Sequence, residues 1–258
     1  MESIRMRTYK GKGKKGEFEM KIVFLGTGEA FGKRANTSIL IDDKILLDCG
    51  NHTLMQLRKI GLNLNRIELV YISHLHADHT FGLPSLFLSS KEERRNKEIE
   101  IIAPAGIKDH IDRILDLSYK KKVDDFKFKI GMREIGEGDK IDFKGYEFTF
   151  AETVHSIDSF AVSVKTDNKL TYTSDGAHSD GVVELAKDSD LLTCEAYMEG
   201  IPGHSSILSA AKLARSSNSR MLALVHVFRG VDASREVEKA EEIFKPILLP
   251  QDLDMMWV

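Results

Sequence analysis

The stretch YISHLHADHTFGLPSL, residues 71–86, places four side chains of the kind that bind metals directly behind a short apolar run. Three of the nine histidines of the chain lie here, within six consecutive positions that also hold an aspartate. Side chains two residues apart on a strand point to the same side, so His74 and His76 can converge on one ion. Asp78 and His79 come where the chain turns towards a helix, and they face a different point. The stretch therefore predicts two neighbouring metal ions rather than one.

Further candidate ligands lie at the ends of other predicted strands. They are His155 in AETVHSID, Asp175 in LTYTSDGAHSD and His226 inside the apolar run MLALVHVF. A lone histidine in a strand is more often a core residue with a hydrogen-bond partner. Together with the first cluster, however, these three residues complete two coordination shells. Imidazole and carboxylate ligands without thiolate indicate two divalent ions, with zinc favoured over manganese or iron.

The whole chain has the composition of an ordinary globular protein. It has 258 residues, 42% hydrophobic and 30% charged, with a net charge of −3, so no global field recruits nucleic acid or an anionic membrane. Two cysteines are too few for a disulfide framework and indicate a reducing compartment. Neither an apolar run of 18 residues nor a secretion signal is found. We therefore expect a cytoplasmic protein that does not associate with membranes.

Periodicity predicts an α/β fold within one domain, residues 1–258. Helical patterns occur at 51–60, 106–119, 181–188, 205–217 and 233–244. Two strand-rich halves predict two sheets packed face to face with helices outside. Residues 1–20 are rich in glycine and lysine, and they fit either a flexible basic arm or an irregular edge strand. Predicted strands cover 21–26, 38–42, 44–48, 67–73, 99–104, 126–130, 140–155, 160–165, 169–174, 190–196 and 221–227.

The H-x-H-x-D-H run, followed by His, Asp and His at later strand ends, resembles the metallo-β-lactamase superfamily of metallo-hydrolases from about residue 21 to residue 230. The resemblance implies a four-layer αββα sandwich of two mixed sheets with a dinuclear site at the sheet edge. It also implies that Asp175 bridges the two metals and shares a hydroxide nucleophile with both. The resemblance divides the other ligands between a first metal, held by His74, His76 and His155, and a second metal, held by Asp78, His79 and His226.

Local matches narrow the resemblance to the ribonuclease Z branch and its phosphodiesterase relatives. They are LGTGEAFGKRANTSILI from residue 25, LLDCG at 46–50, HTFGLPSL at 79–86 and CEAYMEGIPGHSSILSAAKLA at 194–214. The resemblance implies that His204 faces the scissile phosphate beside the acid Glu195, and that Asp48 hydrogen-bonds a ligand histidine. The alternative for His204 is a residue that merely precedes a helix capped by Ser205. The candidate catalytic residues are Asp78, His204 and Glu195.

Three other histidines have plainer interpretations. His52 is expected to open a helix, His110 to lie at the surface of an amphipathic helix, and His178 to be a solvated loop residue.

The sequence departs from ribonuclease Z where that enzyme carries an extruded arm that grips tRNA. His155 and Asp175 are only 20 residues apart, and the segment between them predicts a hairpin. A basic segment could partly replace the arm through Arg5, Arg7, Lys10, Lys12, Lys14 and Lys15. Short or moderate loops at 27–37, 81–97, 156–159 and 176–180 are expected around the site.

The leading hypothesis is a dinuclear-metal phosphodiesterase that acts on a small or nucleotide-like diester through a metal-bridged hydroxide. The alternatives are a tRNA 3′-processing ribonuclease without the arm, a lactone or sulfate-ester hydrolase, and a metal-free binding module on a degenerate fold. RNA as a substrate and a homodimer as an assembly state are both compatible with the sequence.

Overall fold

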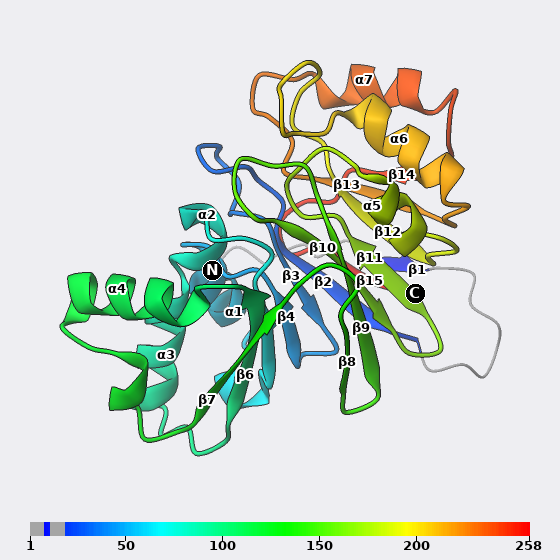
Figure 1. Ribbon diagram of the computed structural model, residues 1–258. Coiled ribbons are helices and arrows are strands. Elements are labelled where there is room, and N and C mark those ends of the chain that lie inside the picture. Colours follow the sequence, from blue (N-terminus) through cyan, green and yellow to red (C-terminus); the bar gives the residue numbers. More distant parts are fainter. Residues whose placement is uncertain (1–7, 11–18) are drawn as a thin grey trace.

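The computed structural model describes residues 8–10 and 19–258, and it confirms the predicted α/β sandwich of two mixed sheets (Figure 1). In the first sheet β4, β5, β6 and β7 run parallel, whereas β15, β2, β3 and β4 alternate in direction. In spatial order its strands are β1 (Thr8–Lys10), β15 (Met255–Trp257), β2 (Lys21–Gly26), β3 (Ser38–Ile41), β4 (Ile45–Leu47), β5 (Leu69–Tyr71), β6 (Ile99–Pro104) and β7 (Ile130–Ile135).

The second sheet is mixed in the same way. In the spatial order given next, the first four strands run parallel to one another. From the fourth strand to the seventh, each neighbouring pair is antiparallel. In spatial order they are β14 (Ile247–Leu248), β13 (Leu222–Val225), β12 (Leu191–Glu195), β11 (Lys169–Tyr172), β10 (Phe160–Lys165), β9 (Tyr146–Glu152) and β8 (Lys140–Phe143).

Alternation along the strands builds the layers. In β2, Ile22 and Phe24 pack in the core between the sheets, whereas Val23 and Leu25 pack under the helices of the first sheet. From the second sheet Phe148 and Phe150 enter the same inter-sheet core, and both are fully buried. Replacing a buried phenylalanine by alanine costs about 3–5 kcal/mol, so this layer holds the two sheets together.

The helices cover the two outer faces (Figure 1). The outer face of the first sheet packs against α1 (Thr53–Lys59), α3 (Leu83–Glu92) and α4 (Ile107–Tyr119). The outer face of the second sheet packs against α5 (Asp180–Leu185), α6 (Ile207–Ser216) and α7 (Ala233–Ala240). The short helix α2 (Ala77–Thr80) carries part of the histidine-rich stretch.

Several predicted boundaries are wrong for identifiable reasons. Residues 126–129 are not a strand: Phe126 and Phe128 alternate because they pack into the core beside α3 and α4, and the strand begins at Ile130. The predicted loop 81–97 contains α3, whose first turn holds Pro84, a favoured position for proline. The predicted strand 140–155 is a hairpin, β8 and β9, that turns at Lys144 and Gly145, both with positive φ.

The segment between His155 and Asp175 is a tight hairpin, as predicted, because β10 and β11 pair antiparallel from Val162–Tyr172 to Lys165–Lys169. At the other edge of the molecule, β1 pairs in parallel with β15, which confirms an edge strand at residues 8–10. The rest of the predicted basic segment, 5–7 and 11–15, lies outside the described residues. Within the described part of the chain, every helix is too short or too polar to cross a membrane.

Candidate metal centre

The predicted ligands all follow strands that end at one edge of the sandwich. His74 and His76 come after β5, and α2 then carries Asp78 and His79. From the second sheet, His155 and Asp175 each lie three residues beyond β9 and β11, strands that run in the same direction because both pair antiparallel with β10. His226 was predicted inside a strand, but β13 ends at Val225 and His226 takes a left-handed backbone conformation with φ 52°. That turn brings its ring to the same edge.

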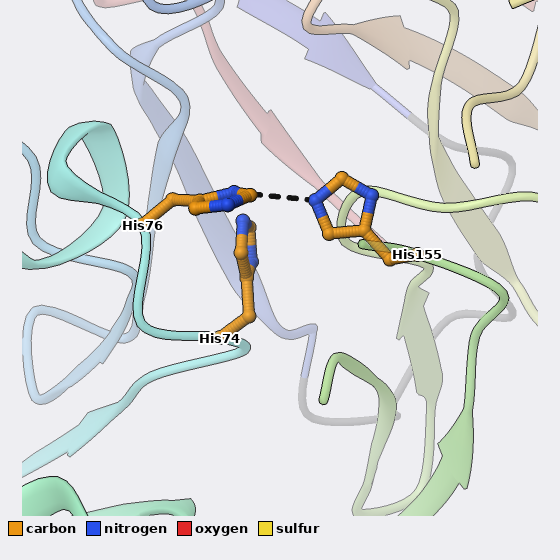
Figure 2. A group of neighbouring side chains, drawn as sticks. All are labelled: His74, His76 and His155. Carbon is orange, nitrogen blue, oxygen red and sulfur yellow. Dashed lines mark hydrogen bonds between the residues drawn. The ribbon is translucent and has the colours of Figure 1, made fainter. Parts of the chain in front are cut away.

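The first ligand group, a cluster of side chains that could hold an ion, brings together His74, His76 and His155 (Figure 2). One ligand atom from each lies within 4.8 Å of the others. The ring centroids are 4.8 Å apart for His74 and His76, 4.9 Å for His74 and His155, and 5.0 Å for His76 and His155. His74 is fully buried, and the other two rings are partly exposed towards the cavity that the group borders.

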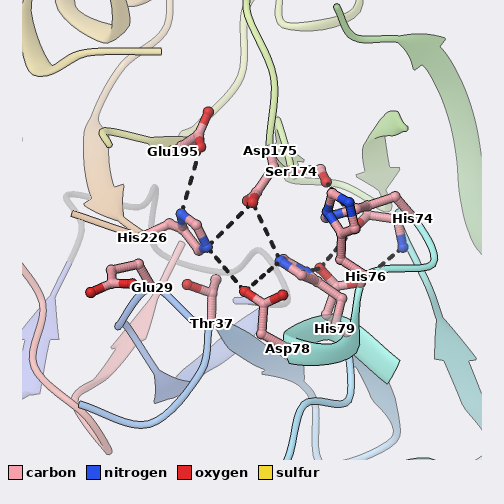
Figure 3. Close-up of polar contacts among 12 residues, drawn as sticks. Glu29, Thr37, His74, His76, Asp78, His79, Ser174, Asp175, Glu195 and His226 are labelled. Atoms are coloured by element: carbon pink, nitrogen blue, oxygen red, sulfur yellow. Dashed lines mark hydrogen bonds and ion pairs between the residues drawn. The ribbon is translucent and has the colours of Figure 1, made fainter. Parts of the chain in front are cut away.

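The second group gathers Asp78, His79, Asp175 and His226 (Figure 3). The Nε2 atom of His226 lies 3.2 Å from an Asp175 oxygen and 3.3 Å from an Asp78 oxygen. The Nε2 atom of His79 lies 3.5 Å from each of the same two carboxylates. Asp175 thus sits with the second group, and the rings of His74 and His79, 4.1 Å apart between centroids, join the two groups.

The residues present fit two divalent ions. Among the described residues, the buried atoms that lack a hydrogen-bond partner include His74 Nε2 in the first group and His79 Nε2, Asp175 Oδ1 and His226 Nδ1 in the second. Buried polar atoms are rarely left unpaired, so unpaired nitrogen and oxygen atoms within such clusters indicate cation-binding sites. Both groups offer only nitrogen and oxygen atoms, because neither Cys49 nor Cys194 belongs to either of them.

The charges of the second group compensate each other. Burial opposes protonation of His79 and His226, but the neighbouring carboxylates, Asp175 foremost, together outweigh it and raise both pKa values, that of His226 to about 10. Burial also opposes ionisation of Asp78 and Asp175, yet the facing imidazoles lower both pKa values. Protons therefore occupy ligand atoms that cations would take, and metal binding has to displace them.

Asp48 contacts the second group through its histidine His79. It is fully buried, and its Oδ2 atom lies 2.8 Å from His79 Nδ1 while accepting hydrogen bonds from Tyr172 and Ser73. A carboxylate on Nδ1 fixes the tautomer and leaves Nε2 of His79 free to bind an ion. Asp48, which directly follows β4, thereby orients a histidine that lies 31 residues later in the chain.

His204 and Glu195 form a third cluster beside the ligands. The Nδ1 atom of His204 makes a short contact with Glu195 Oε1, and this hydrogen bond raises the pKa of His204. The other oxygen of Glu195 accepts the backbone N–H groups of Gly176 and Ser205, at 2.9 and 3.0 Å. The helix is capped by Ser206 rather than by Ser205, the expected cap. Ser205 instead donates to the Gly176 carbonyl at 2.7 Å.

The three clusters border a cavity of about 420 Å³. His76, His155, Asp78, Asp175, His226 and His204 all line it. His178 does not line it and is not a solvated loop residue: its Nε2 atom lies 3.0 Å from Ser205 Oγ, and burial lowers its pKa to about 4. His110 is half-buried rather than at the surface, with Nε2 2.9 Å from Thr80 Oγ1, and His52 precedes α1 as predicted.

Comparison with known proteins agrees with this geometry. Residues 20–243 match the sequence family described as anti-Pycsar protein Apyc1. The chain belongs to this Apyc1 family. The sequence motifs predicted a likeness to ribonuclease Z and its phosphodiesterase relatives, and they did not predict this family.

The wider resemblance is confirmed. Ribonuclease Z of Listeria monocytogenes is 28% identical over an alignment covering 93% of this Apyc1-family chain and 99% of the relative. The human short-form tRNase Z structure is 27% identical, covers 91% of this chain and 98% of its own, and superposes with a TM-score of 0.73. The metallo-β-lactamase fold protein YhfI from Bacillus subtilis is 18% identical with a TM-score of 0.81, covering 93% and 100% of the two chains, and shares the fold.

Several residues that line the cavity were not predicted from the sequence, and two of them, Glu29 and Tyr197, make specific contacts there. Glu29 is 1% exposed, and Tyr197 stacks on His204 with ring centroids 4.6 Å apart. Both lie in stretches whose likeness to ribonuclease Z was recognised, in GTGEAFG and CEAYMEG. A charged residue between a strand and a glycine was the only local signal for Glu29, and its partner Arg229 lies 200 residues away.

Proposed function

We propose that this chain is a phosphodiesterase that depends on two divalent metal ions, with zinc as the favoured metal because five of the seven ligands are histidines. The observation that carries the proposal is the meeting of both ligand groups with the His204–Glu195 pair at one cavity. We assign His74, His76 and His155 to the first ion. We assign Asp78, His79 and His226 to the second, with Asp175 between them.

Bound at these two groups, divalent ions would supply Lewis acidity to the phosphoryl oxygens and lower the pKa of a water nucleophile. The protein's own residues supply the remaining parts. Asp78 lines the cavity, its side chain is 15% exposed, and its lowered pKa keeps it ionised. It can therefore accept a hydrogen bond from the attacking water and orient it.

We assign His204 the role of proton donor to the leaving group. The hydrogen bond to Glu195 raises its pKa and so favours the imidazolium form of the ring. The water oxygen forms a bond to phosphorus and releases one proton to solvent while the ester P–O bond breaks. The leaving oxygen departs with the electron pair and takes a proton from His204, which solvent then protonates again. The products are a phosphomonoester and an alcohol. Before that transfer, the positive ring stabilises negative charge that builds up on the phosphoryl group.

The size of the binding surface favours a small or nucleotide-like diester. The β10–β11 hairpin passes directly from His155 to Asp175 and leaves no arm there to contact a long polyanion. Folded RNA needs many phosphate contacts, and each makes the affinity dependent on salt. A cavity of about 420 Å³ is in the range that holds small ligands.

The second candidate function is tRNA 3′ processing. The ribonuclease Z relative matches 93% of this chain and 99% of its own length, so the alignment is not confined to the metal motifs. Lactone and sulfate-ester hydrolysis have less support, because neither reaction needs the His204–Glu195 pair.

A substrate panel on the zinc-loaded protein tests the proposal. Bis-p-nitrophenyl phosphate should be hydrolysed faster than p-nitrophenyl phosphate, and a lactone and a sulfate ester should react little. A tRNA precursor should bind weakly, and this binding should be lost at moderate salt. Accurate cleavage of the precursor after its discriminator base at physiological salt would favour the second candidate. A protein that purifies without stoichiometric metal would support a degenerate binding module instead.

Membership in the Apyc1 family supports, as the biological role of this hydrolysis, the anti-Pycsar role that the family's name states. Cells with an active Pycsar system should lose its effect on expressing the wild-type chain and keep it on expressing Asp175→Ala. The two buried free cysteines support action in a reducing, cytoplasmic compartment.

A further inference from the structure

A row of aromatic side chains leads outward from His204. Tyr197 stacks on His204 at 4.6 Å between centroids with the ring planes 28° apart, and Phe228 lies 5.1 Å beyond Tyr197. The guanidinium of Arg229 follows, 4.9 Å from the centroid of Phe228 and 5.9 Å from that of Phe31. We call Tyr197, Phe228, Arg229 and Phe31 the aromatic wall. It begins at the proposed proton donor, and two of its members, Tyr197 and Phe31, line the cavity.

A buried carboxylate fixes the outer end of the wall. Glu29 is 1% exposed, and it accepts an ion pair from Arg229 at 2.8 Å and the backbone N–H of Phe31 at 2.7 Å. One side chain thereby ties the loop after β2 to the loop after β13. Because both oxygens of Glu29 are engaged in holding the wall, Glu29 is a positioning residue rather than a ligand for substrate.

The outermost ring is open to solvent although it borders the site. Phe31 is 78% exposed, which is unusual for a phenylalanine whose backbone is held in place. Arg229 covers part of the ring, and the rest is free to contact a ligand. An aromatic surface of this kind gains most from another flat ring, through stacking and through the cation that lies behind it.

We propose that the aromatic wall determines substrate specificity by binding a planar aromatic arm of the phosphodiester, with Phe31 as its exposed stacking surface. The inference rests on the proposed function, since it places the phosphoryl group at the ligand groups. A nucleobase and a nitrophenyl ring share the required chemistry. An aliphatic arm would gain little from the wall.

Two phosphonates that differ only in the arm test this. Phenylphosphonate and methylphosphonate carry the same headgroup, and their dissociation constants on the zinc-loaded protein can be measured by calorimetry without any turnover. The wild type should bind phenylphosphonate about tenfold more tightly, the scale of one stacked ring. Phe31→Ala should remove most of that preference, and Phe31→Trp should keep it. Inhibition of bis-p-nitrophenyl phosphate hydrolysis should give the same order.

Tyr119→Ala is the matched control, because Tyr119 is a 50% exposed aromatic residue at the end of α4, and the preference should not change. Thermal melting shows whether each variant is folded. A folded Phe31→Ala that keeps the full preference, or a wild type without one, overturns the inference even if diesters are hydrolysed. A phenyl preference that depends on Phe31 in a protein that hydrolyses no diester would instead leave the wall standing and refute the proposed function.

Discussion

Glu195 stands between His204 and His226. Its Oε1 atom contacts the Nδ1 atom of His204, and Glu195 itself is fully buried. The same oxygen lies 3.5 Å from Nδ1 of His226 (Figure 3). The proposed proton donor and a ligand of the second metal group thus share one carboxylate. A change in that carboxylate should therefore affect protonation without removing either imidazole.

Glu195→Gln should lower kcat about 100-fold and change its pH dependence. The amide keeps an acceptor for Gly176 and Ser205, but it loses the charge that raises the pKa of His204. Since the protonated ring is the active form, activity falls as the pH rises through the pKa of His204. That fall should begin at lower pH in the variant. A pH–rate profile whose basic limb does not move would contradict the role of Glu195.

His204→Ala should lower kcat by about 10²–10³ and leave the metal content intact, as expected for loss of one oriented donor. Steady-state kinetics and elemental analysis measure the two effects. His110→Ala is a suitable control, because His110 does not line the cavity. Unchanged kcat together with lower thermal stability would show that His204 only precedes the helix.

Asp175→Ala should abolish turnover and lower the occupancy of both metal groups. Its carboxylate faces His79 and His226, and it also acts on the first group, where burial lowers the pKa of His74 and Asp175 opposes that shift. Asp158→Ala, in an exposed loop, is the control. Two tightly bound metals and a near-normal rate in Asp175→Ala would refute the bridging role.

Asp48→Asn should weaken metal binding by about 10–100-fold, because His79 loses the acceptor that fixes its tautomer. Competition with a chromophoric chelator measures the affinity. Asp124→Asn, with a side chain that is 80% exposed, should bind as the wild type does. Equal affinities in all three proteins would show that Asp48 has only a structural role.

His178 should make the metal-free protein less stable in acid. Its pKa is lowered to about 4 in the folded state and is about 6.5 when unfolded, so the unfolded chain binds the extra proton first. Stability is therefore complete above about pH 6.5 and declines as the pH falls towards 4, by up to about 3 kcal/mol. His178→Gln should have a smaller decline in the free energy of unfolding measured in urea. Identical slopes would mean that burial of His178 does not affect its titration.

The sequence was most informative where local pattern and tertiary role coincide. The runs at 21–26, 99–104 and 160–165 match β2, β6 and β10 residue for residue, because each lies in a buried sheet bounded by turns. The ligands could be predicted because they follow such strands. Phe126 and Phe128 misled the analysis, since two alternate phenylalanines pack equally well in a loop.

Contacts between distant segments left no trace in local pattern. Arg229 follows β13 and forms an ion pair with Glu29, and the local sequence around neither residue predicts this contact. The left-handed turn at His226 was equally hidden, because an apolar strand with one histidine reads the same whether the strand ends before that residue or after it.

The candidate ligands follow strands of both sheets, so ions bound between them would link the two sheets where the sheets meet, along the seam of the sandwich. Ions that bind only while the two sheets are packed together increase the free energy needed to separate the sheets by their own binding free energy. Amide hydrogens in β5 and β13, on opposite sides of the seam, would then exchange with solvent through the same rare event. Without the ions, the opening of the two sheets would no longer be coupled, and the amide hydrogens of each sheet would exchange at their own rate.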